Sequence, residues 1–122
     1  MTPAQLAATF DATNLRLDAT GADLRKLCEE AMEAGCAAVC LYPTNVPLAV
    51  DMLKGTEVKV ATVAGFPSGR FEAVSKVAEA LQAAKNGADE IDYVMNYPAL
   101  IAGEETLVAE ELQELCAATR DL

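Results

Sequence analysis

Three short apolar segments of the chain each end in an aromatic residue followed by proline. They span residues 36–43 (CAAVCLYP), 57–67 (EVKVATVAGFP) and 88–98 (ADEIDYVMNYP). Short apolar runs that contain β-branched residues are typical of strands buried on both faces of a sheet. Proline disfavours helix in the residue before it and cannot donate to a strand ladder. The pattern therefore predicts three buried strands, each of which stops at its proline.

Between and after these segments, apolar residues recur at the three- and four-residue spacing of amphipathic helices. Thr20 and Asp23 form a capping-box pattern at the start of the first helix, and Gly35, Gly55 and Gly87 stand where the first three helices would end. The stripes predicted to be buried are Leu24, Leu27, Cys28 and Ala31; then Val46, Ala49, Val50 and Leu53; then Val74, Val77, Ala78 and Leu81; and finally Val108, Leu112, Leu115 and Cys116.

A further strand is predicted over 6–15 (LAATFDATNL), where Asn14 would end it. Strands and helices then alternate along one domain, residues 1–122, which indicates an α/β fold with a parallel sheet. Four such βα units are half of a (β/α)8 TIM barrel, and we expect dimerisation to complete it. The alternative is an open doubly wound sheet, but the stretch DATNLRLDATG contains no Gly-rich phosphate loop.

Charge and composition argue against several classes of partner and site. The formal net charge of -10 disfavours binding to nucleic acid or an anionic membrane. No apolar run is long enough to span a bilayer and no leader pattern opens the chain, so we expect a cytoplasmic protein. The cysteines lack CxxC spacing and histidine is absent, so we expect mostly buried, reduced thiols and neither a metal site nor a cofactor.

Polar side chains are predicted at the carboxyl ends of the strands, where the active sites of parallel barrels lie. In the fourth strand the bulky alternate residues should pack on helices, which turns Asp92 and Asn96 inward. Cys40 lies near the end of the second strand, and Asp11 and Thr13 share a face of the first. These side chains are expected to meet at one substrate-binding mouth. The alternative is that both acids brace backbone and that Cys40 is an inert core thiol.

Four stretches that cover nearly the whole chain resemble the N-terminal half of deoxyribose-phosphate aldolase. They are 10–20, 24–49, 55–69 and 86–100, within which KVATVAGFPSG and NGADEID are specific. The resemblance implies a (β/α)8 barrel that joins acetaldehyde reversibly to glyceraldehyde 3-phosphate through a Schiff-base lysine. It implies a catalytic proton-relay role for one residue, Asp92, and a place around the substrate for four others: Asp11, Thr13, Cys40 and Phe66.

The same resemblance leaves parts of the aldolase without a counterpart. Ala12 stands where the family often has histidine. The family's Schiff-base lysine lies on the sixth strand, its partner lysine on the seventh, and its phosphate-binding loops on the last strands, all of which would follow Leu122. Lys59 begins the third strand at the opposite end of a barrel, and the other lysines fall on helices or at their ends. We therefore expect no lysine of this chain to serve as the Schiff base.

Three functions fit these patterns. The expected one is a homodimeric half barrel, joined through the edges of its first and fourth strands, that lacks aldolase activity and serves binding or regulation. The second is an aldolase subunit completed by a C-terminal half-barrel chain, cleaving 2-deoxyribose 5-phosphate to glyceraldehyde 3-phosphate and acetaldehyde. The third is an enzyme of different chemistry that uses Asp92 and Cys40. The expected ligand is a small sugar phosphate or aldehyde.

Overall fold

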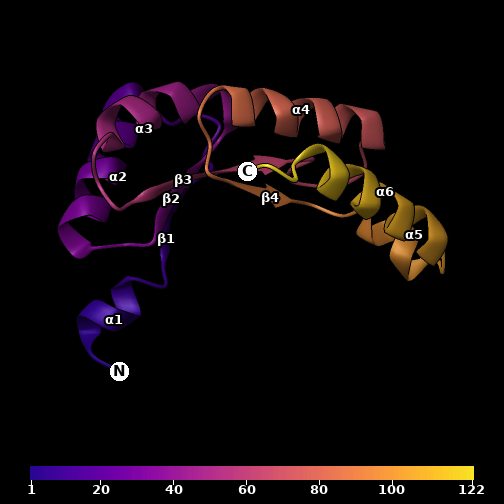
Figure 1. The fold of residues 1–122 in the computed structure, drawn as a ribbon, viewed down its shortest axis with the longest axis horizontal. Coiled ribbons are helices and arrows are strands. Elements are labelled where there is room, and N and C mark those ends of the chain that lie inside the picture. Colours follow the sequence, from indigo (N-terminus) through magenta and orange to yellow (C-terminus); the bar gives the residue numbers. More distant parts are fainter.

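The computed structural model describes residues 1–122 and contains one sheet of four parallel strands, ordered β1-β2-β3-β4 (Figure 1). The strands are β1 (Asp11–Asn14), β2 (Ala38–Leu41), β3 (Lys59–Ala64) and β4 (Glu90–Tyr93). The helices are α1 (Pro3–Ala7), α2 (Gly21–Ala34), the 3-10 turn η1 (Pro43–Asn45), α3 (Val46–Leu53), α4 (Ala73–Lys85), α5 (Tyr97–Ile101) and α6 (Glu105–Ala118).

The first strand is shorter than predicted, because residues 3–7 form a helix instead. Thr2 caps α1 by accepting from the Gln5 backbone N–H, and the Gln5 side chain accepts from the Thr2 N–H in return. Pro3 suits the first turn, where its missing N–H has no helical partner. The prediction of strand over 6–10 was therefore wrong, since this local capping outweighs the apolar content of the segment.

The predicted ends of α2 are confirmed. Thr20 and Asp23 exchange side-chain and backbone hydrogen bonds in a capping box, with lengths of 3.2 and 2.8 Å. Gly35 then ends the helix in the left-handed conformation, with a φ of 69°. These local signals fix where the helix begins and ends before any packing is considered.

Helices cover only one face of the sheet. The main core joins the outward residues of the strands to the predicted stripes of α2 and α3, with Leu24, Cys28, Val46 and Ala49 fully buried. Ile91 of β4 contacts this core and also a smaller core formed with α4 and α6. The four long helices α2, α3, α4 and α6 therefore lie on the same side of the sheet. A doubly wound sheet would have helices on both faces, whereas this layer is that of barrel βα units.

The buried faces of α4 and α6 differ from the predicted stripes. In α4 the chain buries Lys76, Ala80 and Ala83, while Val74 is 67% exposed. In α6 it buries Glu111 and Leu115, and the residues predicted beside Leu115 are exposed or only half-buried. An ion pair between Lys76 and Glu111 occupies the space between these helices. Apolar spacing cannot reveal this arrangement, because it treats both residues as surface residues.

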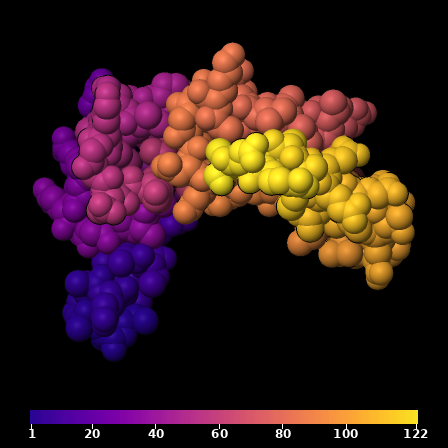
Figure 2. Space-filling view, in the orientation of Figure 1, coloured from indigo at the N-terminus to yellow at the C-terminus, as the bar shows by residue number.

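The inner face and both edges of the sheet remain open. Figure 2 shows α1 at one end and α5 with α6 at the other reaching to the same side of the molecule, with open space between them. β1 and β4 are the edge strands, and neither has a strand on its outer side. The structure contains no helix with the length and apolarity needed to cross a membrane.

Candidate functional site

Four of the predicted residues lie together on the inner face of the sheet. Thr13 of β1 is the register partner of Cys40 in β2, and Asp11 stands one pleat earlier on the same face as Thr13. From β4, Asp92 reaches across so that the Cys40 thiol donates to its Oδ2 atom over 3.8 Å. The alternation of side chains in these strands therefore brings an acid, a thiol and a hydroxyl to one surface, as predicted.

Small side chains on the central strands make room for this contact. Ala38, Ala61 and Val63 form a buried cluster with Cys40, and Ala61 is its register partner on β3. Because Ala61 projects only a methyl group, the sulfur can reach the carboxylate of the next strand. The resulting surface has an apolar floor with Asp92 and Asp11 exposed along its sides.

Phe66 adds an aromatic wall at the carboxyl end of the strands. Its ring packs edge-on against Tyr42 with centroids 5.7 Å apart. Both rings contact the buried inner-face cluster of Ala38, Cys40, Ala61 and Val63. Phe66 comes after Gly65 at the end of β3, and Tyr42 directly follows β2, so neighbouring strand ends place the two rings side by side. The structure therefore places Phe66 at the carboxyl end of the strands beside the inner face, and its place at a substrate mouth stays a prediction.

Cys40 is a neutral hydrogen-bond donor in this setting. Burial raises the pKa of its thiol from 9.0 to about 12, and the nearby carboxylates of Asp92 and Asp11 act in the same direction. A thiol that stays protonated is a poor nucleophile. This observation disfavours one form of the third function considered above, the form in which Cys40 is the nucleophile.

The raised pKa predicts slow alkylation of Cys40. Near pH 8, iodoacetamide should modify Cys40 on the order of 10²–10³ times more slowly than exposed Cys116, since each pKa unit costs about tenfold in thiolate. Peptide mass mapping over time measures both rates in one sample. Asp92→Asn, which removes one carboxylate, should speed the reaction at Cys40 and leave Cys116 unchanged. Equal rates at the two cysteines of the folded chain would contradict the assignment.

Asn96 lies outside this inner surface. β4 ends at Tyr93, so the strand alternation that turned Asn96 inward does not extend to it. Its side chain instead accepts from the Ala99 backbone N–H over 3.2 Å and caps α5. The structure thus uses Asn96 to start a helix, which is the commonest role of asparagine at such a turn.

A buried cluster behind the sheet was not predicted. Lys76 Nζ lies 2.8 Å from Glu111 Oε1 and donates to the backbone carbonyls of Gly69 at 2.6 Å and Val94 at 2.9 Å. The Tyr93 hydroxyl donates to the other Glu111 oxygen. The Lys76 and Glu111 side chains are only 1% and 6% exposed. We call Lys76, Glu111 and Tyr93 the buried triad.

Within the buried triad, Lys76 and Tyr93 stabilise the negative charge of Glu111. Burial raises the pKa of Glu111, but hydrogen bonds from Lys76 and Tyr93 and the charge of Lys76 outweigh it, so the pKa is lowered overall. Burial, followed by the hydrogen bond to Glu111 and its charge, raises the pKa of Tyr93. Glu111 is therefore ionised and Tyr93 neutral near pH 7. One sequence signal could have located Lys76: it interrupts a row of alanines at helical spacing, Ala73, Ala80 and Ala83.

Comparison with known proteins matches this architecture to one family. The model of the DeoC/LacD family of aldolases matches residues 6–120, nearly the whole chain. The chain belongs to the DeoC/LacD aldolase family. It is 45% identical over 118 residues to a deoxyribose-phosphate aldolase from Aciduliprofundum boonei, covering 97% of this chain and 53% of that protein. A relative from Caldanaerobacter subterraneus of the same name is 46% identical, with 94% and 50% covered.

Solved structures of the family superpose on the chain. A candidate deoxyribose-phosphate aldolase from Coccidioides immitis gives a TM-score of 0.96 at 41% identity, over 99% of this chain and 48% of that one. The tetrameric deoxyribose phosphate aldolase of Aeropyrum pernix gives 0.85 at 31% identity, over 95% and 48%. The chain spans about half the length of the relatives it matches, and its fold is half of the aldolase barrel.

The lysines of this aldolase half lie away from the inner surface at the carboxyl strand ends. Lys59 begins β3 at the opposite, amino end, and Lys76 is held behind the sheet in the buried triad. The others, Lys26, Lys54 and Lys85, are exposed on or beside helices. No group of three or more cysteine, aspartate or glutamate side chains is placed to hold a metal ion.

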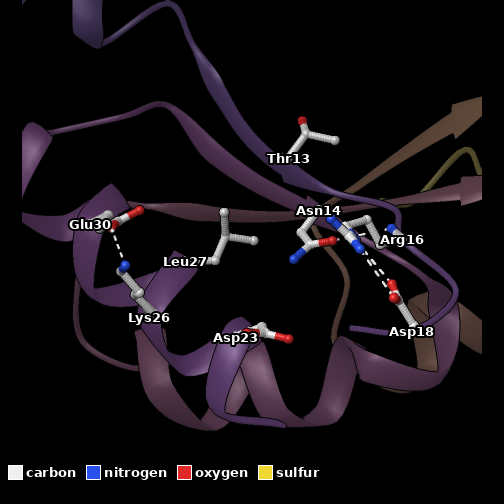
Figure 3. A pocket seen from close by; sticks show the side chains of 8 residues that line it. All are labelled: Thr13, Asn14, Arg16, Asp18, Asp23, Lys26, Leu27 and Glu30. Carbon is white, nitrogen blue, oxygen red and sulfur yellow. Dashed lines mark hydrogen bonds and ion pairs between the residues drawn. The ribbon is translucent and has the colours of Figure 1, made fainter. Parts of the chain in front are cut away.

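A polar hollow of about 440 Å³ runs beside β1 and α2 (Figure 3). Its charges are mostly paired with each other, since Arg16 and Asp18 form an ion pair at 2.9 Å and Lys26 and Glu30 one at 3.7 Å. It is lined by Thr13, Asn14, Arg16, Asp18, Asp23, Lys26, Leu27 and Glu30. The remaining charged residue, Asp23, has no ion-pair partner, and its carboxylate accepts from the Thr20 backbone N–H in the cap of α2. Since the hollow follows the free edge of the sheet, we assign it to that edge and not to the candidate site.

Proposed function

We propose that the chain forms one half of a deoxyribose-phosphate aldolase site and is inactive as an aldolase until a complementary half closes the barrel. The completed site would cleave 2-deoxyribose 5-phosphate to glyceraldehyde 3-phosphate and acetaldehyde. The observation that carries this proposal is the contact between Cys40 and Asp92 on the open inner face, in a family whose named relatives are aldolases about twice as long. The proposed unit is the whole (βα)4 segment, residues 1–122.

Within that site Asp92 would move the protons. Cleavage of a carbon–carbon bond beside an imine requires a base to accept a hydroxyl proton and return one to carbon. Asp92 is exposed on the inner face at the end of β4, where a carboxylate can reach a bound sugar. Cys40 donates a hydrogen bond that orients this carboxylate. Asp11 and Thr13 would bind hydroxyl groups of the substrate, and Phe66 would cover its apolar carbon.

The reacting amine would come from the complementary half, whether it follows in the same polypeptide or belongs to a second chain. Imine formation needs a desolvated amine beside the acid and base groups. Neither Lys59 at the far strand end nor the ion-paired Lys76 meets this requirement. The free edges of β1 and β4 are the places where further strands would pair. A barrel of eight strands would then enclose the inner face.

A second copy of the chain is the other candidate complement. β1 and β4 are both four residues long, so strand β4 of each copy could pair with β1 of the other around a two-fold axis. Against it, Asp11, Glu90 and Asp92 all face inward and none is in an ion pair. Two copies would enclose six such carboxylates, which would repel one another. Such a homodimer would bind ligands without aldolase activity.

One experiment separates these proposals: native mass spectrometry combined with borohydride trapping of 2-deoxyribose 5-phosphate. The chain alone should give no reduced adduct. Mixed with residues of the Aciduliprofundum boonei relative that follow its matched half, it should form a one-to-one complex that carries the adduct on the added half. An adduct on this chain, abolished by Lys59→Met, would overturn the proposal. A stable homodimer that refuses the added half would favour self-closure.

The proposed location is the cytoplasm. The four cysteines are free thiols in the structure, which suits a reducing compartment. Only two of them, Cys28 and Cys40, are buried, so the expectation of mostly buried thiols holds for half of them.

A further inference from the structure

Two segments at the mouth of the site meet at Lys76. The first is the loop over 65–69, which leaves β3 and carries Phe66; the second is 94–96, which follows Asp92 in β4. The Lys76 ammonium donates to Gly69 O in the first segment and to Val94 O in the second. Its remaining hydrogen faces Glu111 Oε1 on α6. Each hydrogen of the ammonium therefore has its own acceptor on a different segment.

The backbone at these positions is built around the lysine. A Cβ atom on Gly65 would lie 2.7 Å from Lys76 Cε, so only glycine lets the stem pass beneath the loop. A Cβ on Gly69 would lie 1.9 Å from the Met95 carbonyl oxygen, which shows how closely the two segments approach. Gly69 N–H also donates to Gly65 O over 2.8 Å, closing the loop on itself. The loop is thus anchored from the helix side of the sheet, at the carbonyl of Gly69.

We propose that Lys76 and Glu111 are positioning residues that set the mouth of the site by fixing the 65–69 loop against the end of β4. They touch no substrate, since both are buried on the helix side of the sheet. Glu111 extends the same device: its Oε2 accepts from Tyr93, which adjoins Asp92, and from the Asn96 backbone N–H at 3.4 Å. Two charged side chains thereby tie the Phe66 loop, the end of β4 and α6 together.

Positioning of the loop has a different consequence from a plain contribution to stability. Removal of a residue that only stabilises the core should not open the 65–69 loop more than it opens the rest of the molecule, when variants of equal global stability are compared. A positioning residue, when removed, should release this loop selectively. Only the expected loss of substrate binding on release of the loop rests on the proposed aldolase function; the release itself does not.

Limited trypsin cleavage tests the proposal in the chain as it stands. Exposed Arg70 follows Gly69 directly, so cleavage after Arg70 reports opening of the loop. The variant Lys76→Met/Glu111→Gln, which leaves no unpaired buried charge, should be cut there at least about tenfold faster than the unaltered chain. Leu24→Ala, in the core under α2, is the matched control: at equal global stability in urea it should leave the rate at Arg70 nearly unchanged.

Two further measurements keep the test decisive where the double variant is too unstable to fold. Glu111→Gln alone retains one acceptor oxygen and should give an intermediate rate at Arg70. In the unaltered chain, the Gly69 amide should exchange with solvent as slowly as the amides of α4. Fast exchange at Gly69, or equal cleavage in Leu24→Ala and the double variant, would overturn the proposal.

The completed barrel gives a separate readout. There the double variant should raise KM for 2-deoxyribose 5-phosphate about tenfold. If the loop is released but the unaltered complex shows no turnover, the aldolase function fails and the positioning role stands. If the unaltered complex turns over and the loop is not released, the positioning role fails alone.

Discussion

Lys76→Met should lower the free energy of unfolding by about 3–5 kcal/mol, measured by urea denaturation followed by circular dichroism. Methionine fills a similar volume, so the loss comes from the partners that remain. Glu111 would be left as a buried carboxylate without a cation, and the carbonyls of Gly69 and Val94 would lose their donor. An uncompensated buried charge costs far more than a net hydrogen bond gains.

A double variant isolates the cost of the stranded charge. Lys76→Met/Glu111→Leu removes both charges and should be more stable than Lys76→Met alone, because buried pairs replaced as a whole are often nearly neutral. Lys85→Met, at the exposed end of α4, is the matched control and should change stability by less than about 0.5 kcal/mol. A loss at Lys76 as small as that at Lys85 would contradict a buried, fully bonded ammonium.

The pH dependence of the same variants should carry the signature of Glu111. Burial acts to raise its pKa, but the bonds and charge of Lys76 with the bond from Tyr93 lower it below 4.5 in the folded chain. A lowered folded pKa means that the stabilisation is complete above pH 4.5 and is lost as the pH falls through the folded value. The free energy of unfolding of the unaltered chain should therefore fall relative to that of Lys76→Met/Glu111→Leu on acidification.

The sequence predicted the elements whose signals are local. The short apolar runs located β2, β3 and β4, and the capping box with Gly35 located α2, because each signal acts within a few residues of the backbone it controls. The predicted stop at proline was wrong for β4, which ends at Tyr93, because Tyr97 and Pro98 already belong to α5. The alternation along β4 placed Asp92 on the inner face correctly as far as Tyr93. Beyond Tyr93 the chain leaves the strand, and the prediction for Asn96 lost its basis.

What escaped prediction depends on partners far apart in the sequence. The buried faces of α4 and α6 are set by Lys76 and Glu111, which are 35 positions apart and lose their surface character only when paired. Apolar periodicity assigned each of them separately to solvent, and so chose the wrong stripe on both helices. The prediction of strand where α1 lies was wrong for the opposite reason: the capping of α1 by Thr2 and Gln5 is a local signal that the apolar content of the segment concealed.

Asp92→Asn should reduce kcat of the completed barrel by about 10²–10⁴, the usual share of a positioned acid–base group. Asparagine keeps the size of the side chain and an acceptor for the Cys40 thiol, so the geometry should survive while the proton transfer does not. Turnover of 2-deoxyribose 5-phosphate, measured as release of acetaldehyde, gives kcat and KM together. An unchanged KM would show that the loss falls on the chemical step.

Asp89→Asn supplies the matched control from the same strand segment. Asp89 precedes β4 at the amino end of the sheet, where its Oδ2 accepts from the Val60 backbone N–H over 2.9 Å, a bond that the asparagine oxygen can keep. Its kcat should remain within about threefold of the unaltered complex, because it lies outside the mouth. If Asp92→Asn behaves like Asp89→Asn, then Asp92 braces its neighbours and the proton must travel through the complementary half.

Borohydride trapping refines a positive result: Asp92→Asn should still form the adduct with the lysine of the other half, but more slowly. The acid and the amine would then be separable contributions of two halves, which is why the inner face of this one can hold its carboxylates without a cation beside them.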